Sequence, residues 1–399
     1  MGDAFESQAP APAPALVYGP RAIEVELGLD LAPLLDGVAR DALRAWLDEL
    51  RTTLAYELGL RLPAVRVASQ PALRPNAYRC LLRGGEVAAG ELLAGCMLAV
   101  AEPVTDMREP LVGVPSREAG TGLPAWWVGP AEAGRATTLG YRVHGPVEVI
   151  GRHLGRVFRT HAGELIGLDD VAAIVAAVAH EQPAAVAAAL AGPGAGPNRL
   201  ELAEYHQVLR LLLAEGVAIR DQATILEAIA HVMRPPRDGH YANFTVWMDA
   251  SRPPDEQHPE RAQRLNNRLV PPSDPAVLAS IVRRALARQL CQQVADADRV
   301  IHAIALRPAV EDLLLEATRR GARAPEFGLL ADTRERLVEN LVREVAADPE
   351  AVVVCEPTVR LTLRRVIARA LPDLRVLAHD EVHPDYRVEV VGRLSLAET

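Results

Sequence analysis

Hydrophobic periodicity changes several times along the chain, and this constrains the fold more than any other feature. Apolar residues alternate with glutamates at Ile23–Leu27, as in a half-buried strand. Over the next stretch, up to Gly59, they recur every three or four residues, as on one face of a helix. A chain of 399 residues is too long for one ordinary core. We therefore expect two to four domains of mixed α and β structure.

The pattern predicts a linker and then four compact subdomains. Residues 1–19 form the linker, because their Ala-Pro alternation favours extended polyproline conformation. The first subdomain mixes strands and helices and is split between residues 20–96 and 146–165. The second, residues 97–145, is a small β-rich insertion in the first, broken by Gly and Pro, with strand-like pieces at Met97–Ala101 and Trp126–Val128.

Helical periodicity dominates the third subdomain, residues 166–295. Two predicted helices, Glu201–Glu215 and Asp221–Met233, meet at Gly216. The polar, proline-rich stretch 234–272 interrupts the pattern and is long for a connection within a compact domain. We interpret it as a loop insertion on the surface.

The fourth subdomain, residues 296–399, alternates strand and helix. Ala351–Cys355 is a continuous apolar run, which is typical of a strand buried on both faces. A predicted helix precedes it and another follows it, and Tyr386–Leu394 alternates as a final strand. This part is expected to be a small α/β domain.

Composition excludes several classes of function. The formal net charge of −9 argues against a nucleic-acid-binding face, which needs clustered basic residues. The chain contains no lysine, so Schiff-base chemistry and a phosphate-binding P-loop lysine are excluded. No apolar run approaches the roughly 18–20 residues that span a bilayer, and the N-terminus is no signal peptide. The chain is therefore expected to be soluble.

Four cysteines without a C-x-x-C pair are expected to be buried reduced thiols of a cytosolic protein: Cys80, Cys96, Cys291 and Cys355.

Candidate catalytic and metal-binding residues are few. An acidic cluster with one histidine precedes the last strand: Asp380, Glu381, His383 and Asp385. Such side chains could hold a metal, but a solvated loop is the favoured interpretation. His153 and His161 are eight residues apart, roughly 80° from a common helix face, so hydrogen-bonded or solvated histidines are expected. Without a G-x-S-x-G or H-E-x-x-H motif, we expect no enzyme activity, no cofactor and no metal.

Several segments, taken in order, carry a resemblance to one family. The most specific runs from Val208 to Glu227 and reads V-L-R-L-L-L-A-E-G-V-A-I-R-D-Q-A-T-I-L-E. Asp221 suits an N-cap within it. The other segments are Ile23–Gly28, Leu73–Arg79 with Gly84 and Glu86, Gly122–Val128 with Gly140 and Tyr141, Val149–Leu154 through Leu165, Val282–Arg288, Glu356–Arg360 and Val376–Glu381. Together they resemble the cytoplasmic domain of the FHIPEP family, the export-gate proteins of flagellar and injectisome type III secretion, over roughly residues 20–395.

The resemblance implies a domain of four subdomains that assembles into a homo-oligomeric, nonameric ring beneath a membrane pore. Such a ring receives export substrates and their chaperones and cooperates with the secretion ATPase complex and the substrate-switch protein. It implies a place at the cytoplasmic face of the bacterial inner membrane, with the membrane reached only through a missing N-terminal region. It implies no catalytic residue, cofactor or metal.

The resemblance also marks a partner-binding site. The family's D-P-A-F-G stretch corresponds to Glu118–Gly122. Glu118 is therefore acidic like the aspartate of that stretch, whereas Thr121 stands in place of its aromatic residue. The family's threonine in T-H-L corresponds to Arg152. Because aromatic anchors dominate many interfaces, these departures favour an injectisome-like or divergent member. Gly122 belongs to the implied site, although turn geometry explains it equally well.

Two further expectations complete the interpretation. The linker is expected to dock on a neighbouring copy, with Phe5 as its large anchor. The alternative function is a free-standing soluble interaction module outside secretion.

Overall fold

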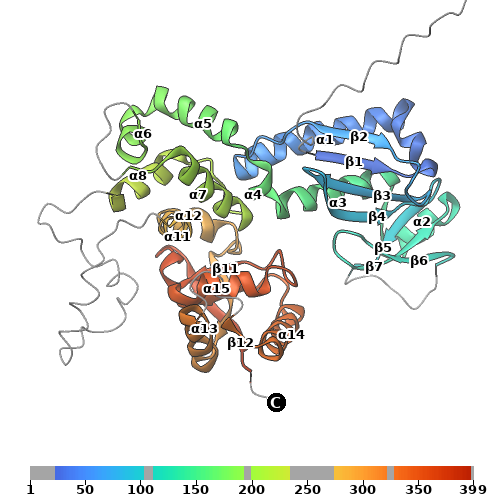
Figure 1. The fold of residues 1–399 in the computed structure, drawn as a ribbon. Helices are drawn as coiled ribbons and strands as arrows, with labels where there is room; N and C mark the ends of the chain where they lie inside the picture. Colours follow the sequence, from blue (N-terminus) through green and yellow to red (C-terminus); the bar gives the residue numbers. More distant parts are fainter. Residues whose placement is uncertain (1–22, 103–110, 193–198, 234–273, 321–327, 397–399) are drawn as a thin grey trace, which may run out of the picture. The chain divides into compact units, whose positions relative to one another are not determined.

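The computed structural model describes residues 23–102, 111–192, 199–233, 274–320 and 328–396 (Figure 1). Two compact units are present. The N-terminal unit comprises the described residues of Met1–Thr53 and Leu62–Phe158, and the C-terminal unit those of Leu54–Arg61 and Arg159–Thr399. The predicted linker 1–19 with Phe5 and the predicted insertion 234–272 lie outside the described residues. The division into four subdomains stays a prediction.

The first sheet of the N-terminal unit has the strand order β2-β1-β3-β4. Its strands are Ile23–Leu27 (β1), Val65–Ser69 (β2), Ala77–Leu82 (β3) and Gly85–Glu91 (β4). β1 pairs in parallel with β2 and antiparallel with β3. Ile23, Val25 and Leu27 are buried and the two glutamates between them are partly exposed, which confirms the predicted alternation.

Helices α1 (Gly37–Leu58) and α3 (Pro146–Thr160) run beside this sheet, and a 3₁₀ turn, η1 (Leu29–Leu35), precedes α1 (Figure 1). Their close approach depends on Gly151 of α3. A Cβ atom at Gly151 would lie 2.5 Å from the Trp46 indole of α1, which is closer than packed atoms come. The glycine therefore allows the tryptophan to lie against the helix backbone.

The second sheet of the N-terminal unit has the order β6-β7-β5-β8 and is antiparallel throughout. Its strands and helix are Met97–Val100 (β5), Gly113–Arg117 (β6), Pro124–Val128 (β7), Pro130–Thr138 (α2) and Arg142–His144 (β8). A small core joins Ala99, Val128, Ala136 and Tyr141. The two strand-like pieces predicted here are confirmed.

The C-terminal unit begins with a helical part. Its helices are Ala162–Leu165 (α4), Leu168–Glu181 (α5), Pro183–Ala189 (α6), Leu202–Ala214 (α7), Gln222–Met233 (α8), Pro275–Ala285 (α11) and Ala287–Gln292 (α12). Asp221 caps α8 as predicted, since its Oδ1 accepts a 3.0 Å hydrogen bond from the Thr224 amide. The single helix predicted from Asp274 to Gln293 is in fact two helices that meet at Leu286.

The last sheet is parallel throughout, in the order β11-β10-β9-β12. Its elements are Val300–Leu306 (β9), Pro308–Arg320 (α13), Ala331–Ala347 (α14), Val352–Cys355 (β10), Pro357–Ile367 (α15), Val376–Ala378 (β11), His379–Glu381 (η3) and Arg387–Leu394 (β12). Every residue of β10 is buried, as the continuous apolar run predicts.

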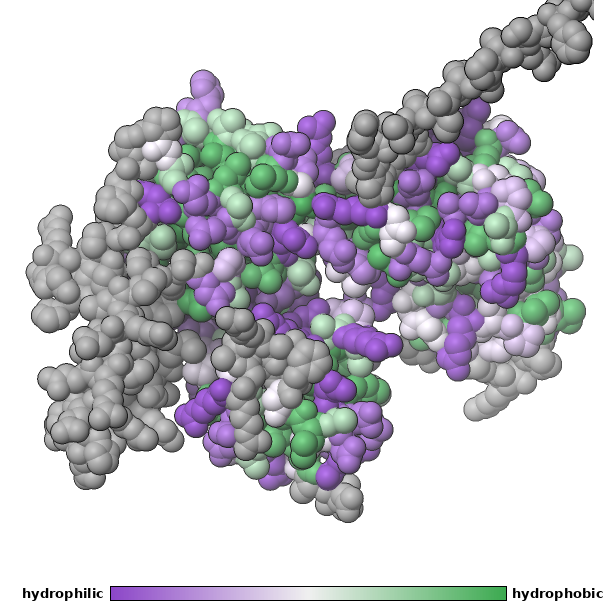
Figure 2. All heavy atoms as spheres, viewed as in Figure 1, coloured by the Kyte–Doolittle hydropathy of each residue, from purple (hydrophilic) through white to green (hydrophobic). Residues whose placement is uncertain are grey.

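Surface and thiol features complete the description. Within the described ranges, no helix has the length and apolar character needed to cross a bilayer. Polar and apolar side chains are interspersed on the face that Figure 2 shows. The four cysteines are unpaired, and three are buried as expected, but Cys96 is partly exposed because it lies in the turn before β5.

Candidate functional site

The predicted partner-binding residues lie on the turn between β6 and β7 and on α3. The Glu118 amide donates to the Leu123 carbonyl (3.0 Å), and the Gly122 amide donates to the Glu118 carbonyl (2.8 Å). Gly122 has a φ of +73°, a conformation that side chains with a Cβ atom disfavour. Turn geometry is therefore sufficient to explain the glycine.

Three of the four predicted residues form one cluster through their side chains. Thr121 Oγ1 donates to Glu118 Oε2 at 2.5 Å, and Arg152 Nε donates to Glu118 Oε1 at 3.2 Å. The Glu118 side chain is only 8% exposed, whereas that of Arg152 is 40% exposed. The carboxylate is therefore held inside the cluster, and the guanidinium of Arg152 is the charged group that a partner can reach.

A buried aromatic pair lies within the electrostatic reach of this cluster. Tyr78 Oη and His153 Nδ1 are 2.7 Å apart, and their rings meet edge to face. Burial raises the pKa of Tyr78. Burial, reinforced by the charge of Arg156, lowers the pKa of His153. Both groups are thus held neutral, and the pair is a structural hydrogen bond rather than an acid–base couple.

The histidine and acidic candidates make hydrogen bonds and ion pairs. His161 Nδ1 lies 2.7 Å from Glu164, so both predicted histidines are hydrogen-bonded, as expected. Asp380 pairs with Arg284 at 3.3 Å, and Asp385 pairs with Arg288 at 2.6 Å. Glu381 differs from its neighbours. The interpretation of this segment as a solvated loop is wrong for Glu381, whose side chain is only 2% exposed.

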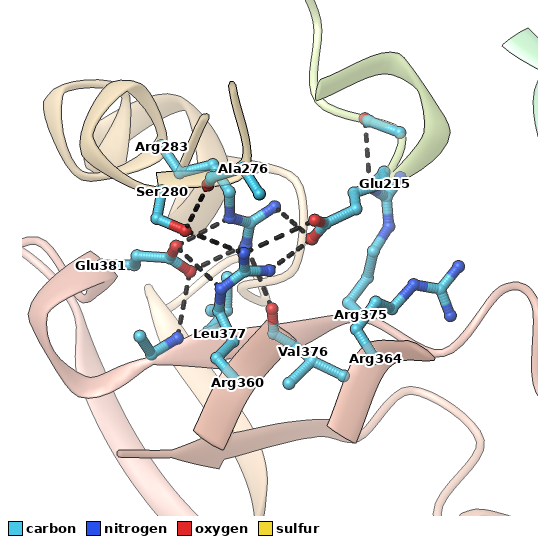
Figure 3. A network of polar contacts seen from close by, with 12 residues as sticks. Glu215, Ala276, Ser280, Arg283, Arg360, Arg364, Arg375, Val376, Leu377 and Glu381 are labelled. Carbon is cyan, nitrogen blue, oxygen red and sulfur yellow. Dashed lines mark hydrogen bonds and ion pairs between the residues drawn. The ribbon is translucent and has the colours of Figure 1, made fainter. Parts of the chain in front are cut away.

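Glu381 belongs to a buried network of four charged side chains, which we call the arginine–glutamate network: Glu215, Arg283, Arg360 and Glu381 (Figure 3). Arg283 Nε and Nη2 donate to the two oxygens of Glu381, each at 2.7 Å. Its Nη1 lies 3.1 Å from Glu215. Arg360 donates to Glu215 and approaches Glu381 at 3.5 Å. Each carboxylate thus contacts both arginines.

The four side chains come from distant parts of the C-terminal unit. Glu215 ends α7, Arg283 lies on α11, Arg360 on α15, and Glu381 ends η3. Both arginines are almost fully buried, and Glu215 is 11% exposed. The network therefore ties the helical part of the unit to its parallel sheet through charges that solvent barely reaches.

The electrostatics of the network favour the ionised state. Burial alone would raise the pKa of Glu215, but Arg360 and Arg283 hold it below its ordinary value. Burial alone would lower the pKa of Arg283, but Glu381 and Glu215 raise it above its ordinary range. The arrangement is structural, because each carboxylate is engaged by two guanidiniums.

Sequence reasoning did not identify this network, although a signal was present. Each of its members lies in a segment that carries the family resemblance: Val208–Glu227, Val282–Arg288, Glu356–Arg360 and Val376–Glu381. The two glutamates and two arginines, one in each of these four segments, could have been proposed as mutual partners. Spacing along the chain alone could not have paired them.

Comparison with known proteins agrees with the fold and the segments. A family model, described as the FHIPEP family, matches residues 6–242 and 264–387. The flagellar biosynthesis protein FlhA of Bacillus subtilis (strain 168) is 30% identical over 379 residues, which cover 93% of this chain and 49% of that protein. FlhA of Escherichia coli (strain K12) is 28% identical over 370 residues, covering 93% and 47%. The chain spans about half the length of these curated relatives.

Solved structures share the fold at lower identity. The structure of the Chlamydia pneumoniae CdsV protein has a TM-score of 0.71 at 18% identity and covers 96% of this chain and 100% of that one. A cryo-EM structure of nonameric EPEC SctV-C has a TM-score of 0.65 at 16% identity, covering 95% and 100%. The predicted mixed, multidomain fold class is therefore confirmed. The roles of Glu118, Thr121, Gly122, Arg152 and Phe5 stay predictions.

Proposed function

The chain belongs to the FHIPEP family, and from this membership we propose that it is the cytoplasmic part of a type III secretion export-gate component. The family model matches both compact units, and this single observation carries the proposal. In this role the chain is a docking platform and not an enzyme. Its place at the inner-membrane face depends on a membrane-spanning region elsewhere in the protein.

The export role predicts a secretion defect. In a bacterium that carries the gene, deleting the region for residues 20–399 is expected to abolish release of type III substrates into the medium. Mass spectrometry of the culture supernatant measures the release. Proteins that leave by the general secretory route provide the internal control. Substrate release at the wild-type level would contradict the export role and favour an interaction module outside secretion.

Self-association into a ring is the second part of the proposal. A structural neighbour was solved as a nonamer, and another, CdsV, was solved in complex with the CdsO protein. By analogy we propose that this chain forms a ring, that the ring docks substrates and chaperones, and that it contacts the secretion ATPase complex and the substrate-switch protein.

The linker is expected to contribute to ring formation. Removing residues 1–19 should shift the chain from ring to monomer, because the linker would no longer dock on the next copy. Native mass spectrometry at fixed protein concentration measures the distribution. Phe5→Ala should reproduce the shift and Tyr18→Ala should not, since Phe5 is the proposed anchor. An unchanged ring in both the truncated chain and Phe5→Ala would rule out this role.

The proposed partner surface is the Glu118–Thr121–Arg152 cluster. The exposed guanidinium of Arg152 is the charged group of this cluster that faces solvent. An arginine held in place by a buried carboxylate presents its remaining N–H groups in a fixed direction. This geometry favours a partner that places an acidic or carbonyl oxygen here. The injectisome-like character suggested by Thr121 and Arg152 stays a prediction, and the curated relatives described above carry flagellar names.

A further inference from the structure

We propose that the C-terminal unit binds a small oxyanion, a phosphate-type group, in the cavity beside the arginine–glutamate network. The cavity has a volume of about 160 Å³. Among its lining residues are four arginines, Arg159, Arg283, Arg364 and Arg375, and two acids, Glu215 and Asp373. Arg159 pairs with Glu57 at 2.9 Å, and Arg283 pairs with Glu381 at 2.7 Å. The two other arginines of the lining are Arg364 and Arg375, and Asp373 is the acid near both.

The charges of the network itself balance. Arg283 and Arg360 contribute two positive charges, and Glu215 and Glu381 contribute two negative charges. The network therefore has no net charge with which to neutralise other cations. A further guanidinium that is partly buried beside it, as Arg364 and Arg375 are, is therefore stabilised by a negative charge from another source.

Two further guanidiniums, Arg364 and Arg375, lie beside the network (Figure 3). Arg375 Nη1 donates to the carbonyls of Glu215 (2.8 Å) and Gly216 (3.0 Å). Arg364 donates to the carbonyls of Leu371, Pro372 and Leu374 at 3.2, 2.8 and 3.5 Å. These hydrogen bonds go to backbone oxygens, which carry only partial charge, and the carboxylate of Asp373 offsets part of the cost of burying both arginines.

The pKa directions of these two arginines also favour a bound anion. Burial lowers the pKa of Arg364, although Glu215 and Asp373 offset part of this effect. Burial, followed by the charges of Arg283 and Arg364, lowers the pKa of Arg375, although Asp373 and Glu215 offset part of this effect. A bound anion would oppose both effects, because an opposite charge nearby stabilises the protonated guanidinium.

The cavity has a route to solvent and further donors. It shares Arg159, Gly216, Gln293 and Arg375 with a larger groove of about 820 Å³ in the same unit. Thr160 and Gln293 also line the cavity and carry side-chain donors. Oxyanions match the planar fork of arginine, so phosphate fits both the charge and the donors of the site.

The test is calorimetric titration of the full chain with inorganic phosphate against chloride at equal ionic strength. We expect saturable binding with a dissociation constant of about 1 mM or lower. Gln293→Glu should weaken binding by about tenfold or more, since it places a like charge beside the anion. Arg375→Gln should weaken it similarly, whereas the exposed Arg369→Gln should leave it unchanged.

The outcomes separate clearly. Absence of saturable phosphate binding, or equal binding in all three variants, would overturn the proposal. If Arg375→Gln fails to fold, Gln293→Glu decides, because its exposed side chain leaves the packing intact. A parallel titration with AMP identifies the source of the oxyanion. Tighter binding of AMP supports a nucleotide phosphate that reaches in from the groove, and tighter binding of phosphate supports the free ion.

Discussion

Glu381→Gln is expected to lower the free energy of unfolding of the C-terminal unit by about 3–5 kcal/mol, because it removes one partner from a buried ion pair. Glu381 accepts two 2.7 Å hydrogen bonds from Arg283 and a third from the Ala378 amide. A neutral amide cannot compensate the guanidinium, so a positive charge would remain buried without its counter-charge. Urea denaturation followed by far-UV circular dichroism measures the loss in free energy of unfolding.

A matched control lies four residues away. Asp385→Asn removes a carboxylate that pairs with Arg288 at 2.6 Å, but both side chains are exposed. Exposed pairs contribute little, because water and salt screen them. Asp385→Asn is therefore expected to leave the unfolding transition almost unchanged. Equal effects of the two substitutions would show that burial does not determine the strength of the network.

The same network predicts a pH dependence of stability. The folded-state pKa of Glu215 is lowered from its ordinary value of 4.5. A lowered folded pKa means that the contribution to stability is complete above the ordinary pKa. It is lost as the pH falls through the folded pKa. The midpoint of urea unfolding for the C-terminal unit should therefore fall on acidification below about pH 4.5, and this dependence should weaken in Glu215→Gln.

The sequence predicts elements well where one side of a segment is buried and the other is not. α7 and α8 begin and end within a residue or two of their predicted limits, because their apolar stripes recur with helical spacing. β10 was predictable because both of its faces are buried and its residues are uniformly apolar. In these cases burial and local periodicity carry the same information.

Sequence reasoning failed where burial does not follow periodicity. β6 contains Pro115 and is mostly exposed, so Gly113–Arg117 shows no apolar alternation. The Glu381 segment looks polar and solvated, yet its carboxylate is buried through partners from α11 and α15. Long-range charge pairing of this kind leaves no periodic trace in the chain. The Glu118 cluster was found only through the family resemblance.

Arg152→Glu is expected to weaken capture of an export substrate–chaperone complex by at least about tenfold, a loss comparable to that of one charge-assisted hydrogen bond. Arg152 is the half-exposed member of its cluster, and its Nε is held by Glu118. The substitution reverses the charge that faces the partner. Biolayer interferometry with the immobilised chain measures the affinity.

This variant tests the surface better than a change at Glu118. Glu118→Arg, also expected to weaken capture, would place a second guanidinium beside Arg152 in a site where the native carboxylate is nearly buried. Its effect on binding could not be separated from an effect on folding. Arg152→Glu also removes the counter-charge of the nearly buried Glu118, but its own side chain keeps an open solvent side. The fall in melting temperature should therefore be smaller than for Glu118→Arg, and it is measured beside the affinity.

The matched control is Arg142→Glu on β8. Arg142 also pairs with a glutamate, Glu102, at 2.9 Å, and its side chain is 55% exposed. It therefore provides a second exposed arginine paired with a glutamate in the N-terminal unit, with a carboxylate that is 30% exposed instead of 8%. If Arg142→Glu and Arg152→Glu weaken capture equally, the effect comes from net charge. Loss confined to Arg152→Glu would identify the cluster as the docking surface, because the two variants change the net charge equally.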